Sequence, residues 1–170
     1  MRMAIRGATL SPTSRSATIE RMRDTFEMAS ILRAYRDFSE CVIDAITWAD
    51  HGTTVAVTFD YPWKPDGGIR GDGEERLYVT LTFKHVQEFD MRNALRVMQV
   101  ADPSCVDWTR NEVALVTIRQ DERSRAYTGD STSFHHAMLR KEGEPYIDIV
   151  FAELEISERR APRRSDTMFE

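Results

Sequence analysis

Two segments of the chain, residues 55–59 and 77–83, alternate apolar side chains with polar or small ones. A period of two residues places the apolar side chains of a strand on one face. The two segments therefore predict a β-hairpin with one buried face. Between them, residues 62–75 contain four glycines and two prolines, so this stretch cannot continue either strand. We interpret residues 62–75 as a mobile surface loop and name it the acidic loop.

A second pattern, with apolar residues three and four positions apart, extends over residues 17–36 and is typical of an amphipathic helix. Ser16 is the expected N-cap, because a serine hydroxyl can accept a hydrogen bond from the first turn. The polar face carries charges of both signs, whereas helices that lie on membranes usually have a basic polar face. We therefore expect this helix to pack on a sheet through Ile19, Met22, Phe26, Ala29, Leu32 and Tyr35.

Several other segments have the composition of strands. Residues 41–48 are rich in β-branched and aromatic side chains, and a turn at residues 50–52 follows them. We also expect Trp48 and Trp108 to be core residues. Further strands are expected at residues 76–86, 111–119 and 134–140, with a polar loop over 124–133 and an ambiguous pattern over 91–98.

The last predicted strand changes its phase. Its apolar positions are odd-numbered up to Phe151 and even-numbered from Leu154 onward. One extra residue in a strand moves all later side chains to the opposite face. The change at Ala152 or Glu153 therefore predicts a β-bulge or a strand that bends between sheets.

These elements predict an α+β protein that is mainly β. We expect an antiparallel β-sandwich or strongly curved sheet of about six strands, with one N-terminal amphipathic helix packed on it. We place a single domain at residues 17–158, between a flexible segment, 1–16, and a disordered basic tail, 159–170. No apolar run approaches the roughly 18 residues that span a membrane, and the N-terminus lacks the apolar core of a secretion signal. We therefore expect a cytoplasmic protein that does not bind membranes.

The net charge of −5 is unevenly distributed. Residues 1–37 and 158–170 together hold 11 of the 23 basic and 7 of the 28 acidic residues, which leaves 12 basic and 21 acidic residues for the body, residues 38–157. An acidic surface repels phosphate backbones, so we expect no nucleic acid to bind the body. The same surface attracts a basic partner, although acidic residues also keep small domains soluble.

Residues that could carry catalytic or metal chemistry are few, and their spacing matches no familiar site. His135 and His136 are adjacent on an expected strand, so their side chains point to opposite faces and cannot hold one ion together. Cys41 and Cys105 belong to no CxxC pair, and we interpret them as structural thiols rather than a disulfide or zinc site. Neither a GxSxG nor an HExxH motif occurs. We therefore predict no catalytic residues, no metal and no cofactor, and favour a protein that is not an enzyme.

The acidic loop is the candidate partner-binding site. It combines an aromatic residue, Trp63, with the carboxylates Asp66, Asp72, Glu74 and Glu75 on a glycine-rich backbone. Exposed aromatic side chains are frequent anchors of protein interfaces. The alternative is structural, with Trp63 covering the end of the sheet. The loop lacks the ligand spacing of an EF-hand, so we do not expect it to bind calcium.

Residues 38–43, 77–86, 108–118 and 146–151 have strand patterns in an order that resembles small bacterial immunity proteins of polymorphic toxin systems and related β-rich domains of unknown function. This resemblance implies a cytoplasmic, non-enzymatic protein that neutralises a toxin, with a basic toxin domain as partner, by occluding its active surface. It assigns no functional residues. Two other hypotheses are a small-ligand-binding β-domain or enzyme that uses a cavity between sheet and helix, and a structural subunit of a larger assembly.

Overall fold

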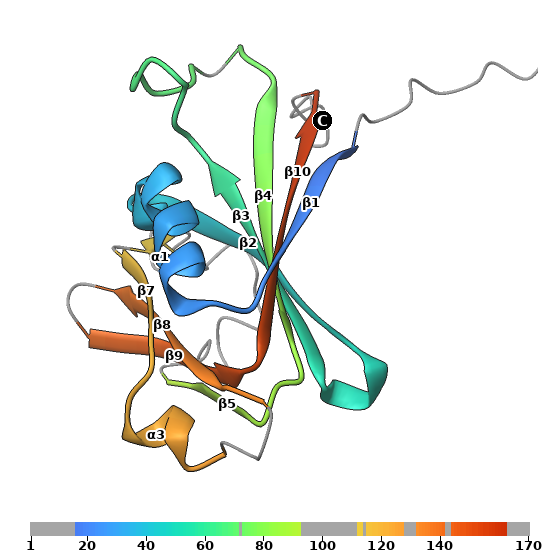
Figure 1. Cartoon of the computed structure of the whole chain (residues 1–170). Helices are drawn as coiled ribbons and strands as arrows, with labels where there is room; N and C mark the ends of the chain where they lie inside the picture. Colours follow the sequence, from blue (N-terminus) through green and yellow to red (C-terminus); the bar gives the residue numbers. More distant parts are fainter. Residues whose placement is uncertain are drawn as a thin grey trace, which may run out of the picture.

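The computed structural model describes residues 16–71, 73–92, 112–113, 115–127, 132–141 and 144–162, and its strands form two antiparallel sheets (Figure 1). The larger sheet has the order β1 (Ser16–Met22), β10 (Glu153–Ala161), β4 (Arg76–Lys84), β3 (Thr54–Tyr61), β2 (Cys41–Ala49) and β6 (Glu112–Val113). The smaller has the order β5 (Glu88–Met91), β9 (Glu144–Phe151), β8 (His135–Lys141) and β7 (Leu115–Arg119). Among the described residues, the helical segments are α1 (Thr25–Ala34), α3 (Glu122–Arg125) and the short turns η1 (Arg36–Phe38) and η2 (Asp50–Gly52). The predicted fold class, α+β and mainly β, is confirmed.

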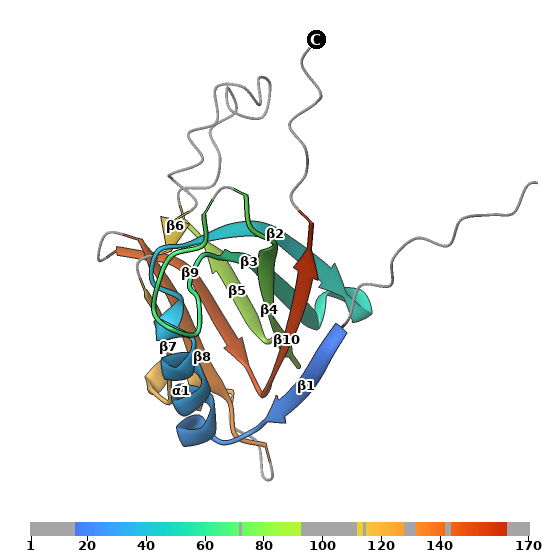
Figure 2. The same cartoon turned by 90° about the horizontal axis from the view of Figure 1, so that it is seen from above.

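Three pairs of consecutive strands that are separated by only one to three residues belong to different sheets, so these short connections join the two sheets (Figure 2). β9 continues into β10 after a bend at Ala152, β4 continues into β5 through residues 85–87, and β6 leads into β7. The strands form a closed ring. In the larger sheet β2 pairs with β3, β3 with β4 and β4 with β10, and in the smaller sheet β9 pairs with β8 and β8 with β7. The chain joins β10 to β9 and β7 to β6, and β6 pairs with β2. The change of phase at Ala152 or Glu153 predicted a bulge or a strand that bends between sheets. This prediction is confirmed, because β9 ends at Phe151 in the smaller sheet and β10 begins at Glu153 in the larger one.

The predicted hairpin is formed by β3 and β4. Val57 lies opposite Leu81, and Phe59 lies opposite Val79. All four side chains are completely buried. Burying an aliphatic or aromatic side chain of this size stabilises a protein by about 1.5–3 kcal/mol, so the hairpin is a principal part of the core.

Helix α1 covers one side of the core and packs against β7. Its buried side chains are Met28 and Leu32. At its C-terminal end, the Tyr35 hydroxyl donates a hydrogen bond to Glu158 Oε1 on β10 at 2.8 Å. The Phe38 ring, in η1, lies 4.6 Å from the Phe59 ring, measured between centroids. The helix is therefore held against both sheets.

The predicted start of the helix is wrong. Residues 16–22 form strand β1, which pairs with β10, and α1 begins only at Thr25. The N-cap is Asp24 rather than Ser16: Asp24 Oδ1 accepts hydrogen bonds from the backbone N–H groups of Phe26 and Glu27. Phe26 is 75% exposed instead of buried. The apolar spacing that suggested one long helix extends across a boundary between a strand and a helix, and pairing with β10 decides the first part.

Other boundaries also differ from those expected. The predicted polar loop at 124–133 overlaps α3, and the predicted strand at 111–119 is divided between β6 and β7. Trp48 is 52% exposed rather than a core residue, because it lies at the C-terminal end of β2, where residues 47–49 are all exposed. Its ring packs edge-on against Phe89. β10 extends to Ala161, three residues beyond the domain end placed at 158. Residues 1–15 and 163–170 and the predicted core residue Trp108 lie outside the described residues.

Candidate functional site

Trp63 fastens the acidic loop to the body of the protein. Its Nε1 donates a hydrogen bond to the Ser39 carbonyl oxygen at 2.9 Å. The Arg36 guanidinium lies over the indole ring, 4.1 Å from its centroid. The side chain is half-buried and packs against the core. These contacts favour the structural interpretation of Trp63, in which the residue supports the loop.

Backbone hydrogen bonds give the acidic loop a defined path. The Arg70 N–H donates to the Pro62 carbonyl oxygen at 2.8 Å, and two further bonds join residues 64–68. Ile69 forms an isolated β-bridge with Trp63 and is 59% exposed. The loop therefore displays an apolar side chain on a hydrogen-bonded backbone. Its mobility stays a prediction.

The predicted carboxylates of the acidic loop do not all converge. Glu74 forms an ion pair within the loop, 2.6 Å from the nearest lysine nitrogen, and Glu75 lies 3.8 Å from an Arg160 nitrogen on β10. Asp66 Oδ1 accepts a hydrogen bond at 3.0 Å from a backbone N–H inside the loop. Asp72 lies outside the described residues.

Glu74 and Glu75 line a groove at the base of the acidic loop, which we name the loop groove. Its volume is about 170 Å³, and its lining consists of Glu40, Val42, Asp60, Tyr61, Pro62, Arg70, Gly71, Glu74, Glu75 and Arg76. Four of these side chains are acidic and two are basic. The sequence analysis missed Glu40 and Asp60. The β2–β3 register, which places Val42 opposite Asp60, was the information needed to find them.

Partial burial and neighbouring charges shift the pKa values of two groups in and beside the loop groove, Asp60 and Cys41. Burial raises the pKa of Asp60, the Arg76 guanidinium 2.9 Å away lowers it, and the Asp44 carboxylate raises it again. Burial first, and then the charges of Asp60 and Glu40, raise the pKa of the Cys41 thiol to about 12. The thiol is therefore neutral at physiological pH, as expected of a structural cysteine rather than a nucleophile. Cys41 is not in a disulfide, and Cys105 lies outside the described residues.

His135, the first of the adjacent histidines, joins β8 to the start of α1. Its Nδ1 lies 2.9 Å from Thr25 Oγ1, and its Nε2 lies 3.0 Å from the Arg23 carbonyl oxygen. Burial lowers the pKa of His135, partly offset by the hydrogen bond to Arg23 and by the Asp24 charge. The residue has the structural role that was predicted.

His136 belongs to a separate buried cluster that the sequence analysis did not find. Its Nδ1 lies 2.7 Å from Asp121 Oδ2, and its Nε2 lies 2.9 Å from Asp148 Oδ1. Burial would raise the pKa of Asp121, but hydrogen bonds from His136, the Ser124 backbone and Arg119 lower it to about 2. The Asp121 carboxylate also caps α3, so the cluster holds this helix on the smaller sheet.

The His136 cluster has the charges of a structural network. Arg123 pairs with Glu88 and lies 3.5 Å from Asp148 Oδ2. The hydroxyl of Ser124, three residues after Asp121, is engaged in the capping box of α3. Both nitrogens of His136 face carboxylates rather than a hydroxyl or thiol that they could activate. This arrangement can orient α3, but it does not form a catalytic triad.

Within the described part of the chain, no three His, Cys, Asp or Glu side chains gather in a way that could hold a metal ion. The helices of that same part include none that is long and apolar enough to cross a membrane. In comparisons with known proteins, no family model, no curated protein and no solved structure matched this chain.

Proposed function

We propose that this chain is a protein-binding module whose acidic loop and loop groove receive a basic surface of a partner protein. The observation that carries the proposal is the lining of the loop groove, where four carboxylates accompany two guanidinium groups. Lys64 and Arg160, which pair with Glu74 and Glu75, lie outside this lining, and such exposed pairs are weak enough to exchange for the basic side chains of a partner. Excess negative charge in a groove attracts basic side chains and accelerates their encounter with it. A basic toxin domain, occluded by this surface, is the partner that the immunity resemblance implies.

The anchoring of the loop supports the same proposal. A loop that is already held in place loses less conformational entropy when a partner binds than a disordered one. Trp63 anchors the loop through its hydrogen bond to the Ser39 carbonyl oxygen, while the Ile69 side chain remains 59% exposed. An apolar side chain surrounded by charged groups is a common composition for the centre and rim of an interface.

The small-ligand hypothesis placed a cavity between the sheet and the helix. That space is filled by Met28, Leu32, Phe38 and Phe59, whose exposed fractions are 0–1%. Side chains packed in this way leave no room for a ligand of ordinary size. The interior therefore gives the ligand hypothesis no support at that location.

The test begins with capture of the partner from the native host on immobilised protein, followed by measurement of its affinity for charge-reversal variants. In the test variant, Glu74→Lys and Glu75→Lys change the lining of the loop groove. In the matched control, Glu27→Lys and Glu122→Lys change two exposed acids on α1 and α3. Both double variants alter the net charge by the same amount.

We expect the test variant to weaken binding by about tenfold or more, mainly through slower association, and to reduce the dependence on salt. The control should bind nearly as the unmodified protein does. Equal effects of the two double variants would mean that only the overall charge matters, and the proposed surface would be wrong. Thermal melting of each variant confirms that it is folded.

The immunity hypothesis has its own test. If a reading frame next to this one encodes a toxin, co-expression of the two should restore growth, and the Glu74→Lys, Glu75→Lys variant should protect less well. Equal protection by that variant and by the matched control would contradict occlusion through the loop groove.

A further inference from the structure

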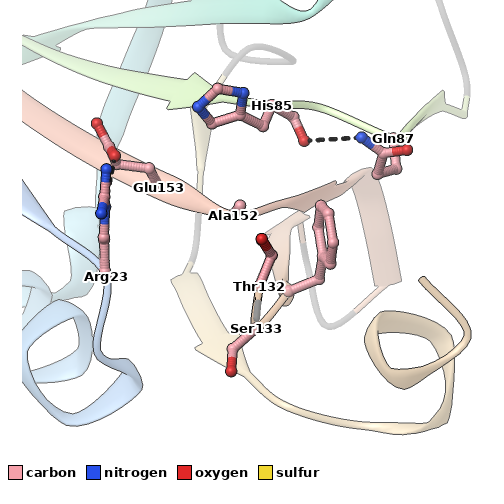
Figure 3. A pocket seen from close by; sticks show the side chains of 8 residues that line it. Arg23, His85, Gln87, Thr132, Ser133, Ala152 and Glu153 are labelled. Carbon is pink, nitrogen blue, oxygen red and sulfur yellow. Dashed lines mark hydrogen bonds and ion pairs between the residues drawn. The ribbon is translucent and has the colours of Figure 1, made fainter. Parts of the chain in front are cut away.

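A second cavity, of about 470 Å³, lies where β9 bends into β10, at the opposite end of β4 from the acidic loop (Figure 3). We name it the corner pocket. Its lining consists of Arg23, His85, Gln87, Thr132, Ser133, Phe134, Ala152 and Glu153. This volume is within the range of about 300–1,000 Å³ that small-molecule sites usually have.

The bend between the sheets creates the corner pocket. On one side of β9 and β10, the neighbouring strand changes from β8 to β1. The last residue bordered by β8 is Phe151, opposite His135, and the first one bordered by β1 is Leu154, opposite Met22. Neither strand covers the two residues between them, Ala152 and Glu153. A gap therefore opens in the wall at this point.

The buried carboxylate of Glu153 ties exposed arginine side chains to the wall of the corner pocket. Glu153 is only 2% exposed. Its Oε2 accepts a hydrogen bond from Arg23 Nε at 2.8 Å, while Arg21 Nε lies 2.5 Å from its Oε1 without hydrogen-bond geometry. The His135 ring on β8 also contacts the backbone of Arg23, because its Nε2 lies 3.0 Å from the Arg23 carbonyl oxygen. The pocket therefore draws its lining from several separate segments of the chain. Phe134, Ala152 and Glu153 are buried, whereas the other lining residues are exposed.

The charges that line the corner pocket largely cancel. Glu153 compensates the guanidinium of Arg23, which would otherwise favour an anion. The remaining hydrogen-bonding groups of the lining are the His85 imidazole, the Gln87 amide and the hydroxyls of Thr132 and Ser133. The amide and the hydroxyls can each both donate and accept. The Phe134 ring and Ala152 supply an apolar side. Figure 3 shows the polar side chains on several sides of the pocket, around Ala152.

We propose that the corner pocket binds a small neutral polyhydroxylated ligand, a mono- or disaccharide. Each hydroxyl of such a ligand donates and accepts at once, which matches the amide and hydroxyl groups of the lining. The C–H face of a sugar ring can pack on Phe134 while the ring hydroxyls meet Gln87 and Ser133. A neutral ligand also avoids competition with the ion pair between Arg23 and Glu153. This site is independent of the acidic loop and of the function proposed for it.

Titrations followed by amide chemical shifts test the proposal on the full chain. The probes are glucose, galactose, N-acetylglucosamine and maltose, with inorganic phosphate and acetate at matched ionic strength as ionic comparisons. We expect at least one saccharide to shift the amides of residues 85–87, 132–134 and 152–153 with a millimolar Kd. The variants Gln87→Leu and Ser133→Ala should each weaken that binding by about tenfold, the effect of losing one hydrogen bond in the pocket. Gln120→Leu, at an exposed position outside the lining, should leave it unchanged.

Three results would overturn the proposal. The first is the absence of shifts at the corner pocket with every saccharide of the panel. The second is stronger binding of phosphate or acetate at the same amides, which would make this an anion site. The third is equal weakening by Gln120→Leu and Gln87→Leu. Melting curves recorded for each variant separate loss of binding from loss of folding.

Discussion

The contacts of Trp63 lead to a quantitative prediction about the acidic loop. The Trp63→Phe variant retains an aromatic ring beneath Arg36 but removes the Nε1 donor, so the Ser39 carbonyl oxygen loses its hydrogen bond. The Trp63→Ala variant removes both the hydrogen bond and the ring. Comparing the two variants separates the polar part of the contact from the rest.

The magnitudes follow from the type and burial of each contact. A neutral hydrogen bond contributes about 1 kcal/mol, and a cation–π contact near the surface about 0.5–1 kcal/mol. Truncation of a fully buried Trp to Ala costs about 3–5 kcal/mol, and Trp63 is half-buried. We expect the free energy of unfolding to fall by about 1 kcal/mol in Trp63→Phe and by about 2–3 kcal/mol in Trp63→Ala.

Urea unfolding followed by far-ultraviolet circular dichroism measures these changes without relying on the fluorescence of the mutated residue. Trp48→Phe is the matched control, because Trp48 is 52% exposed and its substitution should change the unfolding free energy by less than about 0.5 kcal/mol. A double-mutant cycle with Arg36→Ala should give a coupling of about 0.5–1 kcal/mol. If Trp63→Phe and Trp48→Phe are equally stable and the coupling is zero, Trp63 does not anchor the loop.

Three further predictions concern residues outside the acidic loop. Leu32→Ala should lower the unfolding free energy by about 2–5 kcal/mol, whereas Phe26→Ala on the exposed face of α1 should have little effect in the same urea titration; equal losses would contradict the observed helix orientation. The folded-state pKa of Asp121 is depressed from 3.8 to about 2, so the stability it contributes is present above pH ~4 and is lost as pH falls toward ~2, and acid unfolding of Asp121→Asn should lack this component. Cys41, with its pKa raised to about 12, should resist a thiol reagent at pH ~8 in a Cys105→Ser background until the protein unfolds, and rapid labelling of the folded protein would show that the thiol is accessible.

The hairpin and the bend at Ala152 could be predicted because their signals are local. Alternation in residues 55–59 and 77–83 reports which side chains face the core, and the change of phase reports where that face changes. Neither inference requires knowledge of the neighbouring strand. The structure has both features where the sequence placed them.

The start of α1 could have been found by giving more weight to one further local signal. Asp24 is followed three residues later by Glu27, a spacing that marks the N-terminus of a helix. The apolar spacing of Ile19 and Met22 concealed it, because these residues stand three positions apart and so extend the helical period of the residues after Asp24. Only the pairing of β1 with β10, which lies more than 130 residues away in the sequence, decides between a strand and a helix for these two residues.

The loop groove and the His136 cluster could not be read from local patterns. Glu40 directly precedes β2 and Asp60 lies on β3, and their proximity follows from the β2–β3 register. His136 meets Asp121 and Asp148 only because β8, β9 and α3 pack together. For the candidate site, the sequence therefore indicated the loop and two of the groove carboxylates, Glu74 and Glu75, but not the groove itself.

Hydrogen–deuterium exchange of the protein, alone and with its captured partner, tests the central proposal most directly. If the acidic loop and the loop groove receive the partner, exchange should slow at residues 40–42 and 62–76. Residues of the smaller sheet and those around the corner pocket should exchange at the same rate in both samples. Protection centred on β5, β9, β8 and β7, with none at residues 62–76, would contradict the proposed binding surface.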